Sequence, residues 1–254
     1  MNETKFDGMG GIYAKFRPTY AHAFIEYLCS DVGLNKESTV ADIGSGTGIL
    51  TKQLIQISKN VFGVEPNRDM RAVAENYLGD FENFFSVNGT AENTTLCANS
   101  FDFITVAQAF HWFDRAKFKA ECIRILKSNG KVILVWNRRD SNAASVKDCD
   151  SVNEKYCPNF KGFSGGMRGE EYENDFRDFF MGEYKTKNFQ NNLSFDLEGF
   201  IGRTLSASYA LKENDDNYPS YISELTECFY KHAVGGQMIM PNFTRCYIGT
   251  VKER

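Results

Sequence analysis

The 254-residue sequence contains no long run of apolar residues and no dense block of like charge. No stretch approaches the roughly eighteen consecutive apolar residues of a membrane-spanning helix, so we expect no membrane partner. The net charge is −4, and Lys and Arg never gather into a block. Clustered basic residues supply most of the non-specific affinity for a phosphate backbone. Their absence therefore argues against nucleic acid as the main partner.

Disulfide frameworks and metal-binding patterns are lacking as well. The seven cysteines are scattered, no two form a C-x-x-C pair, and there are only three histidines. An odd number of widely spaced cysteines is typical of reduced thiols, and residues 1–7 lack the apolar core of a secretory signal. We therefore expect a cytoplasmic protein without a metal site. The oligomeric state is not predictable from the sequence.

The first half of the chain alternates short apolar runs with helical patterns. Strands separated by helices of this length predict right-handed β-α-β units and a parallel sheet. A turn at residues 128–130, Ser-Asn-Gly, is predicted to end the fourth helix. The predicted strands are residues 39–43, 60–64, 84–87, 101–107 and 131–136, and the predicted helices are 19–31, 48–58, 67–78 and 114–126.

The second half is less regular. From Arg138 to about Tyr184 the sequence is polar with scattered aromatic residues, of which Tyr172, Phe176 and Phe179 could line one side of a helix. No linker flanks this segment, so we interpret it as an insertion between strands rather than a separate domain. Strands near 185–193 and 243–252 and helices at 196–206 and 219–232 are expected to follow, and the two strands could pair antiparallel at the sheet edge.

A glycine-rich turn follows the first predicted strand, in the run V-A-D-I-G-S-G-T-G at residues 40–48. Glycines permit a sharp turn and let a ligand approach the backbone closely. The dinucleotide fingerprint G-x-G-x-x-G would require glycine at position 49, where the chain has Ile49. The Gly-Lys-Ser/Thr of a phosphate-binding P-loop is also absent.

Acidic residues follow three successive strands of the predicted sheet. Asp42 precedes the glycines, Glu65 closes the second strand, and Glu92 follows the third. The carboxyl ends of parallel strands form the edge at which such sheets bind ligands. A carboxylate at Glu65 can accept hydrogen bonds from a ribose diol, and one at Glu92 can accept from an adenine amino group. Asp102 starts its strand, far from this edge, and is interpreted as structural.

With these motifs, the first 138 residues resemble class I S-adenosylmethionine-dependent methyltransferases. Three segments are similar to small-molecule enzymes of the trans-aconitate methyltransferase group, namely FRPTY at 16–20, VEPNRDM at 64–70 and QAFHWFD at 108–114. The resemblance implies one α/β domain over residues 1–254, with a Rossmann-like, doubly wound, mostly parallel seven-stranded sheet and an antiparallel C-terminal edge strand. Residues 1–138 would be its cofactor-binding half, 139–183 an inserted helical cap, and 184–254 the remaining strands and substrate-side helices.

The resemblance also implies that S-adenosylmethionine binds along the carboxyl edge of the sheet. Tyr13 and Arg17 are expected to reach its carboxylate, although a surface ion pair is the alternative for Arg17. The residues expected at its methionyl end are Gly44, Ser45, Gly46, Gly48, Ala107 and Gln108. Those expected at its ribose and adenine are Glu65, Pro66, Met70, Ala91 and Glu92.

Methyl transfer is an in-line displacement that requires alignment and exclusion of water. A carboxylate acceptor needs no general base, whereas a hydroxyl acceptor does, and His111 is the candidate for positioning or deprotonating it. The alternatives are that His111 caps the next helix and that Trp112 packs beneath it instead of walling the pocket. Arg138 could clamp an anionic acceptor or face solvent. The residues expected on the acceptor side are Tyr20, Trp112 and Arg138.

The sequence thus predicts transfer of a methyl group to a small molecule, at a carboxylate or hydroxyl oxygen. Nucleic-acid methylation is disfavoured, because the chain has neither an Asn/Asp-Pro-Pro-aromatic tetrad nor a Pro-Cys dipeptide. A protein that binds S-adenosylmethionine without catalysis is an alternative, since methyl transfer has no obligatory catalytic residue. An NAD-dependent oxidoreductase is a weaker alternative because of the glycine spacing.

Overall fold

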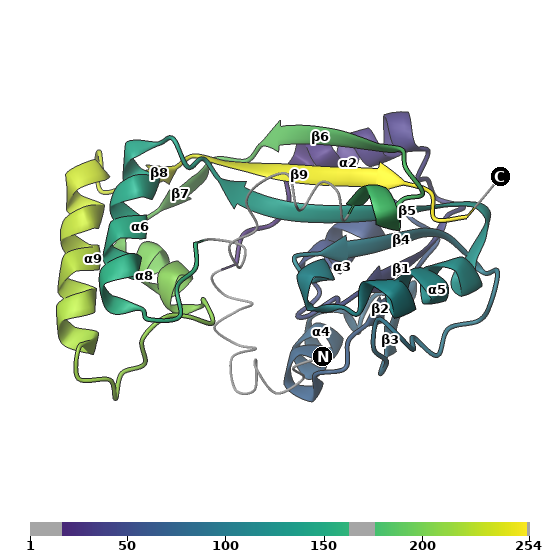
Figure 1. Cartoon of the computed structure of the whole chain (residues 1–254), viewed down its shortest axis with the longest axis horizontal. Helices are drawn as coiled ribbons and strands as arrows, with labels where there is room; N and C mark the ends of the chain where they lie inside the picture. Colours follow the sequence, from purple (N-terminus) through teal and green to yellow (C-terminus); the bar gives the residue numbers. More distant parts are fainter. Residues whose placement is uncertain (1–16, 163–175, 253–254) are drawn as a thin grey trace.

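The computed structural model describes residues 17–162 and 176–252 of the chain (Figure 1). Within these ranges seven strands form one sheet in the order β3-β2-β1-β4-β5-β9-β6. The strands are β1 (Thr39–Ile43), β2 (Asn60–Val64), β3 (Phe84–Val87), β4 (Phe101–Ala107), β5 (Leu126–Arg139), β6 (Tyr184–Gln190) and β9 (Asn242–Gly249).

Strands β1 to β5 pair in parallel, as their separation by helices predicts. The C-terminal strand β9 pairs antiparallel with β5 on one side and with β6 on the other. The predicted seven-stranded, mostly parallel sheet with an antiparallel C-terminal strand is therefore confirmed. In this order β6 is the outermost strand, and β9 lies between it and β5.

Helices cover both faces of the sheet, and the side chains of each strand alternate between two cores. One core contains Val40 and Phe103 with the helices on their side, and the other contains their neighbours Ala41 and Ile104 with α5 and the residues around Phe176. Short helices η1 and η2 complete the layers. The elements are α2 (His22–Tyr27), η1 (Leu28–Val32), α3 (Ile49–Ile55), α4 (Arg68–Leu78), η2 (Phe110–Trp112) and α5 (Arg115–Ile125).

A cap stands beside the sheet, on the left in Figure 1. Its core contains Val146, Phe200, Tyr221 and Phe229 from three helices, together with apolar residues of a two-stranded sheet. Of the described residues of segment 139–183, α6 lies in the cap, and the other described cap elements come from later in the chain. The cap elements are α6 (Ala144–Tyr156), β7 (Leu193–Phe195), α8 (Leu197–Leu205), α9 (Tyr218–His232) and β8 (Met238–Met240).

Two helices begin one residue after the predicted start, because the predicted first residue of each is a polar N-cap. The side chain of Asn67 accepts a hydrogen bond from Met70 N, and that of Asp114 accepts one from Lys117 N. The first described helix begins at His22 and not at residue 19. Residues 19–21 instead use their backbone groups in hydrogen bonds with side chains of the sheet and of α3.

The predicted turn at residues 128–130 is wrong, because these residues belong to β5, which starts at Leu126 directly after α5. The pairing of β4 with β5 shifts register between Phe101 and Phe103. Gly130 lies at this irregularity, where an added Cβ would stand 2.7 Å from Leu126 Cδ2. The glycine thus serves a bulge in a strand, which is a common use of glycine there, and does not end a helix.

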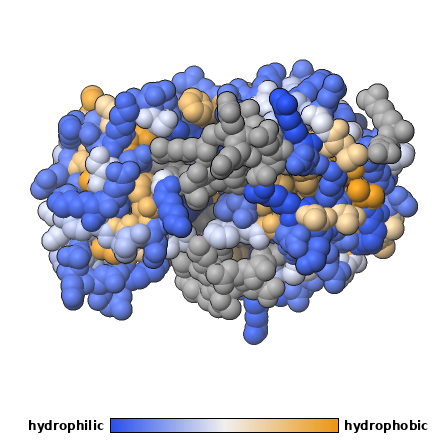
Figure 2. Space-filling view, in the orientation of Figure 1, coloured by the Kyte–Doolittle hydropathy of each residue, from blue (hydrophilic) through white to orange (hydrophobic). Residues whose placement is uncertain are grey.

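The surface is largely hydrophilic on the face that Figure 2 shows, with apolar residues in small groups. Among the described residues, none of the helices combines the length and the apolar character that a membrane crossing demands.

Candidate functional site

The glycine turn connects β1 to α3, and its three glycines have left-handed φ angles of +68°, +56° and +83°. A Cβ at Gly44 would lie 2.7 Å from Ala109 Cβ, and one at Gly48 would lie 2.6 Å from Leu78 Cδ1. A Cβ at Gly46 would meet nothing within 4 Å. Gly44 and Gly48 therefore allow close packing of the protein, whereas Gly46 faces open space that a ligand can enter.

Asp42 supports this turn from beneath. Its carboxylate is fully buried and accepts hydrogen bonds of 2.7 Å from Thr51 Oγ1 on α3 and from Thr105 Oγ1 on β4. Burial raises the pKa of Asp42 to about 6, although the two hydroxyl donors oppose the rise. The side chain thus joins the strand, the helix and the neighbouring strand around the turn.

Glu65 directly follows β2, and its side chain reaches the glycine turn. Its Oε2 accepts a hydrogen bond of 2.9 Å from Gly46 N, and its Oε1 accepts one of 2.8 Å from Asn67 N. The side chain is 9% exposed, and burial raises its pKa against the effect of the two backbone donors. A buried carboxylate has spare lone pairs beyond two hydrogen bonds, so Glu65 can also accept hydrogen bonds from ligand hydroxyls beside the open space at Gly46.

The loop after β3 is tied to α5 at two points. Glu92 accepts a hydrogen bond of 2.9 Å from Asp114 N. Glu121 accepts from both the backbone N–H and the hydroxyl of Thr94, and from the guanidinium of Arg124. Burial acts to raise the pKa of Glu121, but these hydrogen bonds outweigh it and lower the pKa to about 2. Ala91 and Met70, which are predicted to lie at the adenine, are both buried.

The segment after β4 places its residues beside the glycine turn. Gln108 has a left-handed φ of +59°, its N–H donates to Val135 O, and its side chain donates to Asn137 O over 3.4 Å. His111 and Trp112 lie on η2, both half-buried, with ring centroids 4.6 Å apart. The segment therefore brings Gln108 and the His111–Trp112 pair to the edge where the glycine turn lies.

The other predicted site residues are placed as follows. Tyr20 is buried beside Phe24, with ring centroids 6.4 Å apart. Arg17 donates a hydrogen bond of 2.9 Å to Ser206 O at the end of α8, and Arg138 is half-buried near the end of β5.

Ala107 ends β4, and Ser45 Oγ lies close to where a Cβ of Gly63 would be. Pro66 is half-buried next to Glu65. Tyr13 lies outside the described residues.

Three further polar residues, Tyr209, Arg139 and Arg203, were not predicted as site residues from the sequence. Burial raises the pKa of the Tyr209 hydroxyl, and the nearby positive charges of Arg139, Arg203 and Arg17 act against that rise. Arg203 is buried on the same face of α8 as Phe200. An arginine on the apolar face of a predicted helix was the available signal, since charged residues seldom occupy such positions without a purpose.

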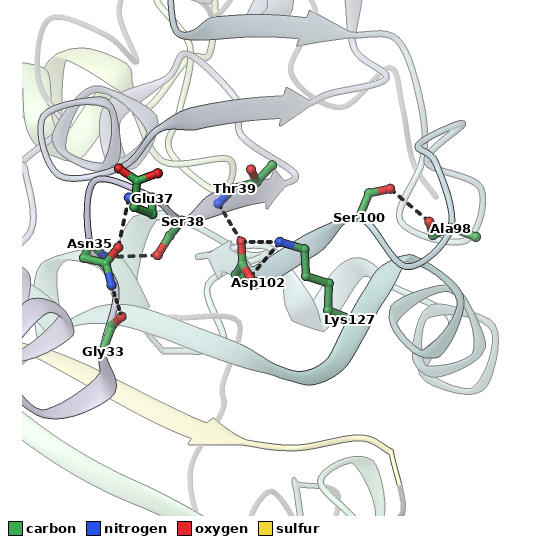
Figure 3. Close-up of polar contacts among 9 residues, drawn as sticks. All are labelled: Gly33, Asn35, Glu37, Ser38, Thr39, Ala98, Ser100, Asp102 and Lys127. Carbon is green, nitrogen blue, oxygen red and sulfur yellow. Dashed lines mark hydrogen bonds and ion pairs between the residues drawn. The ribbon is translucent and has the colours of Figure 1, made fainter.

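The opposite edge of the sheet contains a hollow of about 380 Å³, lined by residues around Asn35, Asp102 and Lys127 (Figure 3). Asp102 accepts hydrogen bonds of 2.9 Å from Thr39 N and from Lys127 Nζ. These contacts join the starts of β1, β4 and β5, which agrees with a structural role for Asp102. Within the described ranges, no three His, Cys, Asp or Glu side chains gather as metal ligands do.

Known proteins resemble this chain over the same elements. Residues 41–134 match the family model described as a methyltransferase domain. An uncharacterized methyltransferase of Mycobacterium tuberculosis is 34% identical over 147 residues, which cover 58% of this chain and 58% of that protein. The chain thus aligns with little more than half the length of this curated relative.

Solved structures share the fold at low sequence identity. A putative type II methyltransferase from Anaeromyxobacter dehalogenans aligns with a TM-score of 0.66 at 18% identity, covering 94% of this chain and 100% of that one. A SAM-dependent methyltransferase from Aquifex aeolicus aligns with a TM-score of 0.52 at 17% identity, covering 70% of this chain and 89% of that one. Residues 41–134 are therefore similar to a methyltransferase domain, and the chain shares its fold with solved methyltransferases.

Proposed function

We propose that this protein transfers a methyl group from S-adenosylmethionine to an oxygen atom of a small, anionic acceptor. One observation carries the cofactor assignment. The Glu65 carboxylate is held by Gly46 N and Asn67 N directly beside the open space at Gly46. A ribose diol fits this arrangement, because it presents two hydroxyl donors to one carboxylate.

The remaining cofactor assignments follow from the position of each residue along the carboxyl edge. Pro66, Met70, Ala91 and Glu92 would flank the adenine, and Gln108 would approach the methionyl group with the glycine turn. Glu92 also accepts a hydrogen bond from Asp114 N, which joins the loop on the adenine side to the segment after η2. Arg17 would pair with the cofactor carboxylate while its side chain also contacts Ser206 O.

When bound, S-adenosylmethionine supplies a methyl group on a positively charged sulfur. The residues of the chain then have to orient the acceptor, exclude water and, for a hydroxyl acceptor, accept a proton. The half-buried His111 follows β4 at the edge where the methyl group is expected. We assign it the positioning of the acceptor oxygen, and proton acceptance where that oxygen is a hydroxyl. Trp112 beside it supplies an apolar wall.

The charge of the acceptor is inferred from the group around Tyr209. Arg139 comes from β5, Arg203 from α8 and Arg17 from the segment before α2, and all three act on the Tyr209 hydroxyl. Arginine side chains from three parts of the chain near one hydroxyl support an anionic acceptor, because a guanidinium can pair with a carboxylate through two parallel hydrogen bonds. A carboxylate acceptor is already ionised and needs no general base.

The test is transfer of labelled methyl groups into a fractionated extract of small metabolites. We expect label in the acidic fraction, released by mild alkali as from a methyl ester. Arg203→Met should reduce this transfer by tenfold or more, on the scale of a lost charged hydrogen bond, and leave S-adenosylhomocysteine binding unchanged. Binding of the cofactor without transfer into any fraction would favour a non-catalytic binding protein.

A further inference from the structure

We infer that Asn137 and Asn191 are positioning residues, which hold the backbone of residues 17–21 so that Arg17 lies at the cofactor edge of the sheet. This inference rests on the proposed function for the role of Arg17. We call residues 17–21 the entry segment. They precede α2, and the side chains that hold their backbone, from Asn137, Asn191, Thr244 and Gln53, belong to no motif of the sequence.

The backbone of the entry segment is held by side chains from four parts of the fold. Thr19 O accepts hydrogen bonds from Asn137 Nδ2 over 3.1 Å and from Asn191 Nδ2 over 3.0 Å. Ala21 N donates to Thr244 Oγ1 over 2.9 Å. Gln53 on α3 pairs with both backbone groups of Tyr20, accepting from its N–H and donating to its carbonyl. Backbone groups outside regular structure require such partners when they are withdrawn from water.

The same asparagines connect to one another and to the site. Thr244 Oγ1 donates to Asn137 Oδ1 over 2.7 Å, and Asn191 Nδ2 lies 3.2 Å from the same oxygen. The backbone carbonyl of Asn137 accepts from the Gln108 side chain. Asn137 is 8% exposed and Thr244 is fully buried, so each amide and hydroxyl in this network is costly to leave without a partner.

The network lies where the chain crosses between the sheet and the cap. Three connections between the sheet and the cap meet here, namely β5 to α6, β6 to β7 and β8 to β9. Asp140 N donates to Pro241 O, and Asn191 N donates to Asn242 O. Figure 1 shows β5 running toward the cap at this point and β9 running back from it. The side chain of Arg17 reaches the cap at Ser206 O. The entry segment is thus fixed at its backbone by the sheet and at Arg17 by the cap, and the two asparagines set where Arg17 stands.

Asn191→Asp tests this role, because it preserves shape while replacing the amide donor with a carboxylate. That carboxylate would face the acceptors Thr19 O and Asn137 Oδ1. We expect the Tyr20 and Ala21 amides to exchange hydrogen about tenfold faster or more. We also expect S-adenosylhomocysteine affinity, measured by calorimetry, to fall about fivefold, the scale of one hydrogen bond. In an Arg17→Ala background the same substitution should produce little further loss of affinity, because the two residues act in series.

Asn83→Asp is the matched control. Asn83 Nδ2 also donates to two backbone carbonyls, Ile55 O and Ser58 O, but at the opposite end of the strands. It should cost comparable thermal stability and leave both the exchange of residues 20–21 and the affinity as in the wild type. Unchanged exchange or unchanged affinity in Asn191→Asp would overturn the inference, as would full additivity with Arg17→Ala. Failure of the wild type to bind S-adenosylhomocysteine would instead contradict the proposed function, and the exchange rates alone would then decide whether Asn191 holds the segment.

Discussion

Glu65→Gln is the substitution that most sharply separates cofactor binding from folding. The carboxylate accepts from Gly46 N at 2.9 Å and from Asn67 N at 2.8 Å. A glutamine keeps one acceptor oxygen and turns an NH₂ group toward the second N–H. It also loses charge where the ribose hydroxyls are expected. Hydrogen bonds to a charged acceptor contribute about 1.5–3 kcal/mol each, so the cofactor should bind more weakly by about 1–3 kcal/mol, or roughly 5- to 150-fold.

The effect on folding should be smaller than the effect on binding. Burial raises the pKa of Glu65, which means that its charge is unfavourable in the folded state, and removing it offsets part of the lost hydrogen bonding. Calorimetric titration with S-adenosylhomocysteine and a thermal melt measure the two effects. Glu224→Gln is the control, because Glu224 also accepts from Tyr156 and Lys155 but lies in the cap. Equal affinity of Glu65→Gln and the wild type would refute the ribose assignment.

The remaining predictions concern the glycine turn and its support. Gly48→Ala should destabilise the fold by about 2–3 kcal/mol in urea unfolding, because its φ is +83° and its Cβ would meet Leu78 Cδ1 at 2.6 Å. Gly46→Ala should cost only about 1 kcal/mol of stability but weaken S-adenosylhomocysteine binding, since its Cβ would enter open space. If Gly46→Ala lost more stability than Gly48→Ala, the assignment of Gly48 to packing and of Gly46 to the ligand would be contradicted. Because the pKa of Asp42 is raised to about 6, the folded state keeps this proton after the unfolded chain has lost it near pH 4, and the contribution of Asp42 to stability falls as pH rises between those values. Asp42→Asn should remove up to about 3 kcal/mol of that dependence, and an unchanged pH profile would show that the carboxyl is not perturbed.

The strands on the cofactor side were predictable to the residue. Residues 39–43, 60–64, 84–87 and 101–107 are short apolar runs between polar turns, and the structure has the same bounds. The buried strands β1 and β4 carry this signal because helices cover both of their faces, whereas β3 lies at the sheet edge and is partly exposed. The position of the acids along one edge was also predictable, because parallel strands bring their carboxyl ends to the same edge of the sheet.

The cap was only partly predictable. The helices expected at 196–206 and 219–232 are confirmed as α8 and α9. A helical cap was expected at 139–183, but α6 could not be located within it, because its apolar positions are few and lie among Asp, Ser and Lys. The helix is stabilised by packing against α9, through contacts such as Tyr221 Oη to Asn153 Oδ1 at 2.7 Å, which join residues far apart in the chain. The group around Tyr209 was missed for a related reason, since Arg17, Arg139 and Arg203 come together only when the cap folds back beside the sheet.

Calorimetric titration of the wild-type protein with S-adenosylmethionine and, separately, with NAD tests the central claim most directly. The open space at Gly46 and the carboxylate at Glu65 predict saturable binding of S-adenosylmethionine, and the Ile49 in place of a third fingerprint glycine predicts no comparable binding of NAD. Tight binding of NAD without binding of S-adenosylmethionine would contradict the account.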